Sequence, residues 1–140
     1  MPRSVAVCFA ISILCIALLL ASCRGAASGP REIAWDREAC AHCHMLVGDP
    51  AFAAQLTTRD GESLIFDDPG CLFVYQAERG PDVVGVWFQH AGRWLPAAEV
   101  GFVAARSPMG YGLAATDART GTISLPEAQL RVAARERASR

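Results

Sequence analysis

The sequence predicts a small α+β domain, and three observations lead to this class. Short apolar segments alternate with turn-forming residues after position 50, which is typical of strands and hairpins. At Asp68-Pro69 and at Ser124-Leu-Pro126 a capping side chain precedes a proline, which predicts the start of a helix. The chain has 140 residues. About 118 of them follow the N-terminal segment, which is enough for one domain with a modest core.

The first 22 residues have the pattern of a lipoprotein signal peptide. Arg3 precedes an apolar run, and the small residues at its end lead into Cys23. An uncleaved membrane anchor is the alternative, but the run is at the short end of lengths that span a bilayer. We expect cleavage before Cys23, lipidation of its sulfur, and a small, polar tether over residues 23–34. The domain is then expected at 35–140.

The charge of the chain argues against a nucleic-acid partner. The formal net charge is −1 at pH 7. Loss of Arg3 with the signal peptide makes the net charge about −2. No basic face of the kind that binds phosphate backbones is evident, so we expect no nucleic-acid binding.

The first half of the domain is predicted to contain a hairpin and a helix. Asp60-Gly61 supplies the positive φ of a tight turn between two apolar segments. Asp67 and Asp68 are most simply helix caps before Pro69, and Gly80 ends the helix. The elements expected here are strands at 33–35, 51–58 and 62–66 and a helix at 69–79.

The second half is predicted to repeat strands and end in a helix. A turn at 90–93 separates two strand segments, and His90 in this turn is expected to be solvated. Ser124 and Glu127 form a capping box, which predicts an amphipathic helix to about residue 135. The strands expected here are 83–89, a return beginning at 94–95, and 101–105.

A faint internal repeat relates the two halves. Met45 is followed by a strand, an Asp-Gly turn, a strand and a helix that begins near Pro69. Met109 is followed by a strand, a Thr-Gly turn, a strand and a helix that begins near Pro126. The similarity suggests that Met45 and Met109 occupy equivalent points of two halves.

The segment Cys40-Ala-His-Cys-His-Met45 is the strongest indication of chemistry. It gathers two thiols, two imidazoles and a thioether, and sulfur donors are the ligands that copper(I) prefers. Met109 lies between Pro108 and Gly110, a poor place for ordinary core packing. We expect these sulfur side chains to bind copper(I), with a histidine as an optional donor.

Other uses of the same cysteines remain open. Cys40-x-x-Cys43-His44 is also the attachment motif of c-type haem, with Met109 as a second axial ligand. Against haem stand the predicted strands, since small c-type cytochromes are helical. A thioredoxin-like pair lacks the preceding buried strand, and a zinc site lacks a second ligand pair. A Cys40–Cys43 disulfide is a further alternative in an oxidising compartment. Cys71 is expected to be a buried small hydrophobe.

Taken together, these motifs resemble the NosL family, the copper-binding lipoproteins that are accessory to nitrous oxide reductase. The resemblance covers about residues 35–130. It rests on the lipobox and on the following motifs in order: Cys40-x-x-Cys43-x-Met45, Gly61 with Phe66-Asp67-Asp68, and Pro108-Met109-Gly110. His44 departs from the family pattern, which usually has glycine there.

The resemblance implies an α+β fold of two related ββαβ-type halves. It also implies a copper(I) metallochaperone, not an enzyme, that delivers copper to nitrous oxide reductase or its assembly machinery. The expected location is the periplasmic face of a bacterial membrane, more often the outer one. The carried-over ligands are Cys43, Met45 and Met109, and Cys40 and His44 are further candidates.

Overall fold

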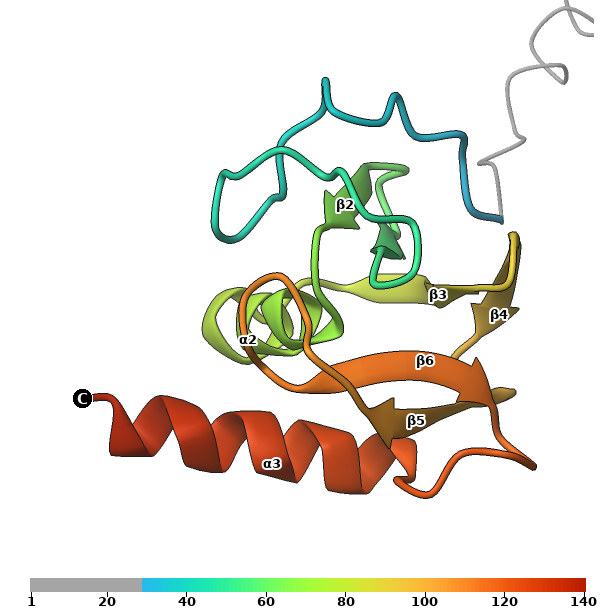
Figure 1. The fold of residues 1–140 in the computed structure, drawn as a ribbon. Coiled ribbons are helices and arrows are strands. Elements are labelled where there is room, and N and C mark those ends of the chain that lie inside the picture. The colour runs from blue at the N-terminus through green and yellow to red at the C-terminus, as the bar shows by residue number, and fades with distance from the viewer. Residues whose placement is uncertain (1–28) are drawn as a thin grey trace, which may run out of the picture.

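The computed structural model describes residues 29–140 (Figure 1). The predicted signal peptide and the lipidation site at Cys23 lie outside these residues. Neither helix of the described region is long and apolar enough to cross a membrane. The elements are, in order, β1 (Ala54–Thr58), β2 (Ser63–Phe66), α2 (Pro69–Arg79), β3 (Val83–His90), β4 (Arg93–Pro96), β5 (Val100–Ala104), β6 (Leu113–Asp117) and α3 (Leu125–Ala138).

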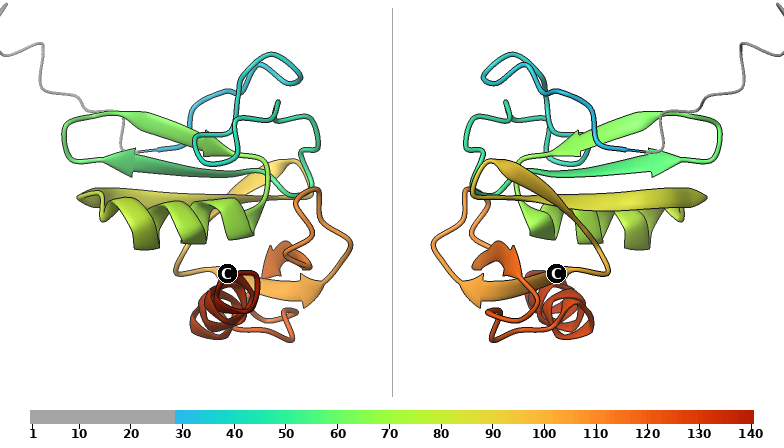
Figure 2. Two further views of the ribbon diagram at one scale, coloured as in Figure 1. Left: turned by 90° about the vertical axis from the view of Figure 1, so that its left-hand side faces the viewer. Right: turned by 90° about the vertical axis from the view of Figure 1, so that its right-hand side faces the viewer.

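Within residues 29–140, two antiparallel sheets and two helices confirm the α+β class. The larger sheet has four strands in the order β2-β1-β3-β4, and the smaller one pairs β5 with β6. Helix α2 packs on β1 and β2 and also contacts α3, which lies against β5. Figure 2 shows α2 between the four-stranded sheet and α3, with the blue segment that precedes β1 on the opposite side of the sheet.

The segment before β1 is part of the domain. Gln55 in β1 is fully buried, and its side chain accepts a hydrogen bond from the Arg31 N–H (3.0 Å) and donates one to the Arg31 carbonyl (2.7 Å). Ile33 is buried in the core. The domain therefore begins before the predicted boundary at residue 35. The strand predicted at 33–35 does not form, because the chain turns from residue 35 onwards.

Three aromatic rings join the two sheets through α2. Phe73 of α2, Phe88 of β3 and Phe102 of β5 meet pairwise, with ring centroids 5.2 to 5.9 Å apart. Phe88 and Phe102 are fully buried. Rings at such distances and tilts gain attraction beyond their burial. One continuous core therefore connects the halves.

The helix ends follow the sequence closely. Asp68 caps α2 by accepting a hydrogen bond from the Gly70 N–H, and Gly80 ends the helix in the left-handed region at φ 56°. Ser124 caps α3 through the Glu127 N–H. Helix α3 continues to Ala138, a few residues beyond the predicted end.

The second half of the chain is shorter than the repeat suggests. The first half runs β1-β2-α2-β3, a ββαβ order. After β6 and the turn at Thr120-Gly121, the chain does not return along β6, because Ile123 forms an isolated bridge with Phe102 of β5. The strand that the repeat suggested after the Thr-Gly turn is therefore reduced to this single bridge. Within residues 29–140 no strand follows α3, so the ββα order occurs twice and the full ββαβ order once.

Candidate metal centre

Three thiols meet where the loop before β1 touches the start of α2. The sulfur atoms of Cys40, Cys43 and Cys71 all lie within 4.8 Å of one another. All three cysteines are free, and Cys40 and Cys71 are fully buried whereas Cys43 is partly exposed. Such a group has the donors and the spacing to hold a metal ion.

A tight loop places the first two thiols. The Cys40 N–H donates to the Met45 carbonyl (2.8 Å), and the His44 N–H donates to the Cys40 carbonyl (3.0 Å). His44 closes the loop with φ 63°, in the left-handed region where glycine is favoured. The N–H groups of His42 and Cys43 then point at the Cys40 sulfur, and that of Met45 points at the Cys43 sulfur. Donors aimed at sulfur favour the thiolate, which is the form that binds metal.

Strand β2 and helix α2 bring the third thiol to this loop. The Ala41 N–H donates to the Ile65 carbonyl of β2 (2.9 Å), which fixes the loop beside that strand. The chain then passes Asp67, whose N–H also points at the Cys40 sulfur. Cys71 follows in the first turn of α2, and its thiol donates to Cys40.

The three thiols differ in acidity. The hydrogen bond from Cys71, aided by backbone N–H groups and opposed by burial, lowers the pKa of Cys40 to about 5. The same hydrogen bond and burial raise the pKa of Cys71 well above its usual range. Burial raises the pKa of Cys43. Because thiolates are the metal-binding form, binding of a metal by these sulfurs releases protons from the thiols.

Two buried carboxyl groups stand beside the thiols. Burial raises the pKa of Asp67 to about 6 and also raises the pKa of Asp68. Asp68 is more than a helix cap, because its second oxygen accepts the Met109 N–H (3.1 Å). The carboxylate thus ties the Met109 loop to the end of α2 that carries Cys71.

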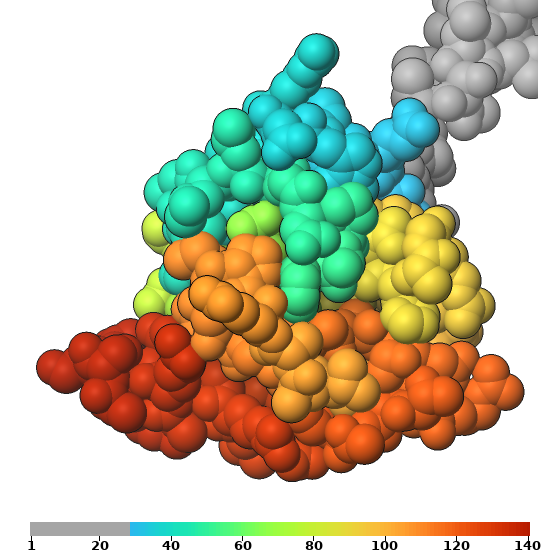
Figure 3. Space-filling view, viewed as in Figure 1, coloured from blue at the N-terminus to red at the C-terminus, as the bar shows by residue number. Residues whose placement is uncertain are grey.

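The Met109 loop is fixed at both ends. The Gly112 N–H donates to the Ser107 hydroxyl (3.0 Å), and the Tyr111 hydroxyl donates to Glu136 of α3 (3.0 Å). Met109 itself is half-buried and packs against the core. In Figure 1 this loop, between β5 and β6, rises beside α2. In the space-filling view its orange surface lies between the blue-green N-terminal part and the red α3 (Figure 3).

The remaining ligand candidates lie at the edge of the cluster. Met45 contacts both cysteines through its backbone, but the residue is 57% exposed. His44 is exposed, and Nδ1 of His42 lies 3.9 Å from a Glu78 oxygen. In the described region no imidazole or carboxylate joins the three sulfurs.

The structure therefore brings Cys40 and Cys43, two of the candidate ligands named from the sequence, together with Cys71. Cys71 is buried, as expected, but it is also part of the thiol group. Its sequence signal was its position in the first turn of a helix that directly follows the strand beside the Cys40 loop. The sequence does not show that the Cys40 loop lies beside this strand, so the position of Cys71 could not be recognised as part of the site.

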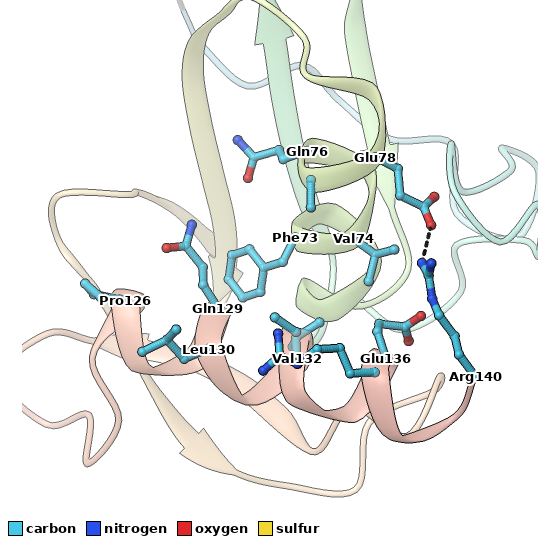
Figure 4. Close-up of a pocket in the computed structure, with 13 residues that line it drawn as sticks. Phe73, Val74, Gln76, Glu78, Pro126, Gln129, Leu130, Val132, Glu136 and Arg140 are labelled. Carbon is cyan, nitrogen blue, oxygen red and sulfur yellow. Dashed lines mark ion pairs between the residues drawn. The ribbon is translucent and has the colours of Figure 1, made fainter.

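A larger hollow lies elsewhere, between α2 and α3. This groove has a volume of about 860 Å³, and its walls include Phe73, Val74, Leu130 and Val132. Figure 4 shows these apolar side chains along the groove and the ion pair of Glu78 with Arg140 at one end. The groove has no thiol, thioether or imidazole among its lining residues, so it is separate from the metal centre.

Comparison of the chain with known proteins does not identify a family for it. No family model, no curated protein and no solved structure matches it.

Proposed function

We propose that the protein is a copper(I) carrier that holds one ion at the cluster of Cys40, Cys43 and Cys71 and passes it to a client protein. The observation that supports this proposal is the meeting of three free thiols within 4.8 Å. Two of them are shielded from solvent and one is reachable. A shielded site protects bound copper, and a reachable sulfur allows a client to take it.

The number and type of donors favour copper(I) over zinc. Structural zinc is almost always tetrahedral and needs four ligands. Within residues 29–140 the cluster offers three sulfurs and no histidine or carboxylate. Copper(I) is soft and prefers thiolate and thioether donors. The resemblance to NosL adds the thioethers of Met45 and Met109 to the donor set, with His44 as a further candidate.

The client and the location are proposed from the resemblance alone. NosL proteins are accessory to nitrous oxide reductase, so we propose that this enzyme or its copper-assembly machinery receives the metal. Lipidation at Cys23 would hold the carrier on the periplasmic face of a bacterial membrane.

The burial of Cys40 argues against the haem alternative. Covalent attachment requires both sulfurs of the Cys-x-x-Cys-His motif to reach the edge of a porphyrin. Cys40 is fully buried and hydrogen-bonded to Cys71, and the hollow beside it has a volume of only about 350 Å³. A thiol oxidoreductase is disfavoured for a related reason, because the acidic thiol is the buried one.

Metal titration tests the proposal. The chain with Cys23→Ala is made in the periplasm of cells that can attach haem, and copper(I) is titrated against a chromophoric chelator. We expect a colourless protein that binds one copper(I), shows thiolate-to-copper absorption in the near ultraviolet, and keeps its copper in excess zinc. The matched variant Cys71→Ser is expected to weaken binding by about 100-fold, by analogy with lost metal-site contacts.

Two results would contradict the proposal. One is a red protein whose haem mass persists after denaturation. The other is a folded, reduced protein that binds no copper(I) or gives it up to zinc.

A further inference from the structure

Solvent exposure divides the sulfur donors of the candidate centre into two groups. Cys40 and Cys71 are fully buried, and Cys43 is partly exposed. Met45 is more than half exposed, at 57%. The three thiols and the Met45 thioether therefore follow one another from the core to the surface. A metal that enters or leaves the cluster has Cys43 and Met45 on its solvent side.

Met45 is held close to the cluster although its side chain is free. Its N–H points at the Cys43 sulfur, and its carbonyl accepts the Cys40 N–H at 2.8 Å. The backbone position is thus fixed by both cysteines of the loop. The methionine side chain has three rotatable bonds and a polarizable sulfur, so it can swing from solvent onto a metal at Cys43. Leu46, the next residue, is similarly exposed at 55% but has no donor atom.

We infer that the centre works with two ligand sets, a buried resting set and an exposed transfer set. Cys40, Cys43 and Cys71 hold copper(I) at rest. Cys43 and Met45 hold it during handover, and Met45 is a transfer ligand and not a resting one. This inference rests on the proposed copper-carrier function and names the route by which that function operates.

Each step of the handover is a ligand exchange without redox chemistry. The Met45 sulfur donates an electron pair to copper, and the bond to the Cys71 sulfur breaks. Cys71 keeps that electron pair and takes a proton from water. A thiolate or thioether of the client then binds copper as the bond to Cys40 breaks, and that electron pair stays on Cys40. A second donor of the client displaces Met45 and then Cys43, and each of these sulfurs keeps the electron pair of its broken bond. Copper remains in the +1 state throughout.

Separate measurements of affinity and transfer rate test the two ligand sets. The full chain with Cys23→Ala is loaded with copper(I), and transfer to bathocuproine disulfonate is followed by absorbance at several chelator concentrations. For the parent we expect a rate that rises with chelator concentration, as ligand exchange requires. For Met45→Leu we expect transfer slowed about tenfold with the dissociation constant changed less than about threefold. For Cys71→Ser we expect weaker binding and faster transfer.

Leu46→Ala is the matched control, since it removes an exposed apolar side chain without touching a donor. Its transfer rate is expected to equal that of the parent. The inference is overturned if Met45→Leu weakens binding as much as Cys71→Ser, because Met45 is then a resting ligand. It is also overturned if Met45→Leu transfers at the parent rate, or if the parent rate is independent of chelator. A parent that binds no copper(I) instead refutes the proposed function itself.

Discussion

Met109 is held in place by its backbone N–H, so its thioether sulfur is available as a metal ligand. The N–H bond to Asp68 fixes the residue beside α2, and this bond does not depend on the side chain. We therefore expect Met109→Leu to keep the fold, because leucine is close to methionine in volume and apolarity. If the thioether contributes to the centre, copper(I) affinity should fall about fivefold. Chelator competition and a thermal unfolding curve measure the two effects. An unchanged affinity would remove Met109 from the ligand set.

Asp67 makes the stability of the metal-free protein depend on pH. Burial raises its pKa from 3.8 to about 6, so the folded state binds a proton that the unfolded state releases. The contribution of Asp67 to stability is therefore full below pH 3.8 and is lost as the pH rises through about 6. Asparagine does not titrate, so the variant lacks this loss. We therefore expect the free energy of unfolding of Asp67→Asn to rise relative to that of the parent by about 1 kcal/mol between pH 4 and 7.5, after allowance for solvent screening.

Urea unfolding at the two pH values measures this difference. Glu99→Gln changes an exposed carboxylate and is expected to keep the pH dependence of the parent. If Asp67→Asn shows the same pH dependence of unfolding as the parent, titration of the Asp67 carboxyl group is not its cause.

Sequence reasoning at the scale of single residues found two of the three thiols. Cys40 and Cys43 stand in one short loop, so their proximity follows from the chain itself. Cys71 is far from them in sequence, and a cysteine in a helical first turn is more often a core residue than a ligand. Its role depends on the pairing of β1 with β2, which carries the start of α2 to the loop. That information is tertiary, so local pattern did not supply it.

At the scale of elements, the N-terminus of α2 is the junction of three segments. Asp68 accepts the Gly70 N–H (2.8 Å), the Met109 N–H (3.1 Å) and a hydrogen bond from Ser107. Asp68→Ala leaves these donors unpaired and is expected to lower the free energy of unfolding by about 2–3 kcal/mol. Asp68→Asn keeps a hydrogen-bond acceptor, so its free energy of unfolding is expected to fall less than that of Asp68→Ala. Denaturant unfolding compares the two. Equal losses would show that the charge, and not the hydrogen bonds, stabilises the junction.

The elements themselves were largely predictable, since their signals are local. The Asp cap, the proline and Gly80 define α2, and Asp60-Gly61 defines the first hairpin. The Thr120-Gly121 turn was predicted, but the strand suggested after it does not form. Gly101 and Gly121 pass so close that a Cβ on Gly121 would lie 2.7 Å from the Gly101 Cα. The chain after this turn therefore lies along β5, and the sequence pattern shows a turn without showing which strand lies next to it.

At the scale of the whole molecule, the contact of three phenylalanines decides whether the halves unfold together. Phe102 of β5 contacts Phe73 of α2 and Phe88 of β3. Phe102→Ala opens a cavity between the sheets and is expected to cost about 3–4 kcal/mol, while Phe102→Leu costs less. We expect one cooperative transition for the parent and both variants, measured by tryptophan fluorescence and circular dichroism. Two separate transitions in the parent would show that the halves are independent.

The arrangement of the two sheets and the helices could not be predicted from sequence patterns. Apolar alternation predicts strands, but neither the order β2-β1-β3-β4 nor the separation of β5 and β6 into a second sheet can be read from it. The faint internal repeat and the resemblance to a known family supplied the expectation of two halves. The missing final strand in the second half shows the limit of that expectation within residues 29–140.

The number of thiols in the cluster has a consequence for anyone who handles the protein. Residues 29–140 contain three cysteines, and three is odd. Any single internal disulfide among them leaves one sulfur over. If the buried Cys40 and Cys71 pair, the leftover sulfur is the partly exposed Cys43, which can then link two molecules. An oxidised sample is thus expected to contain covalent dimers that disappear on a reducing gel, and its apparent copper stoichiometry falls below one in proportion.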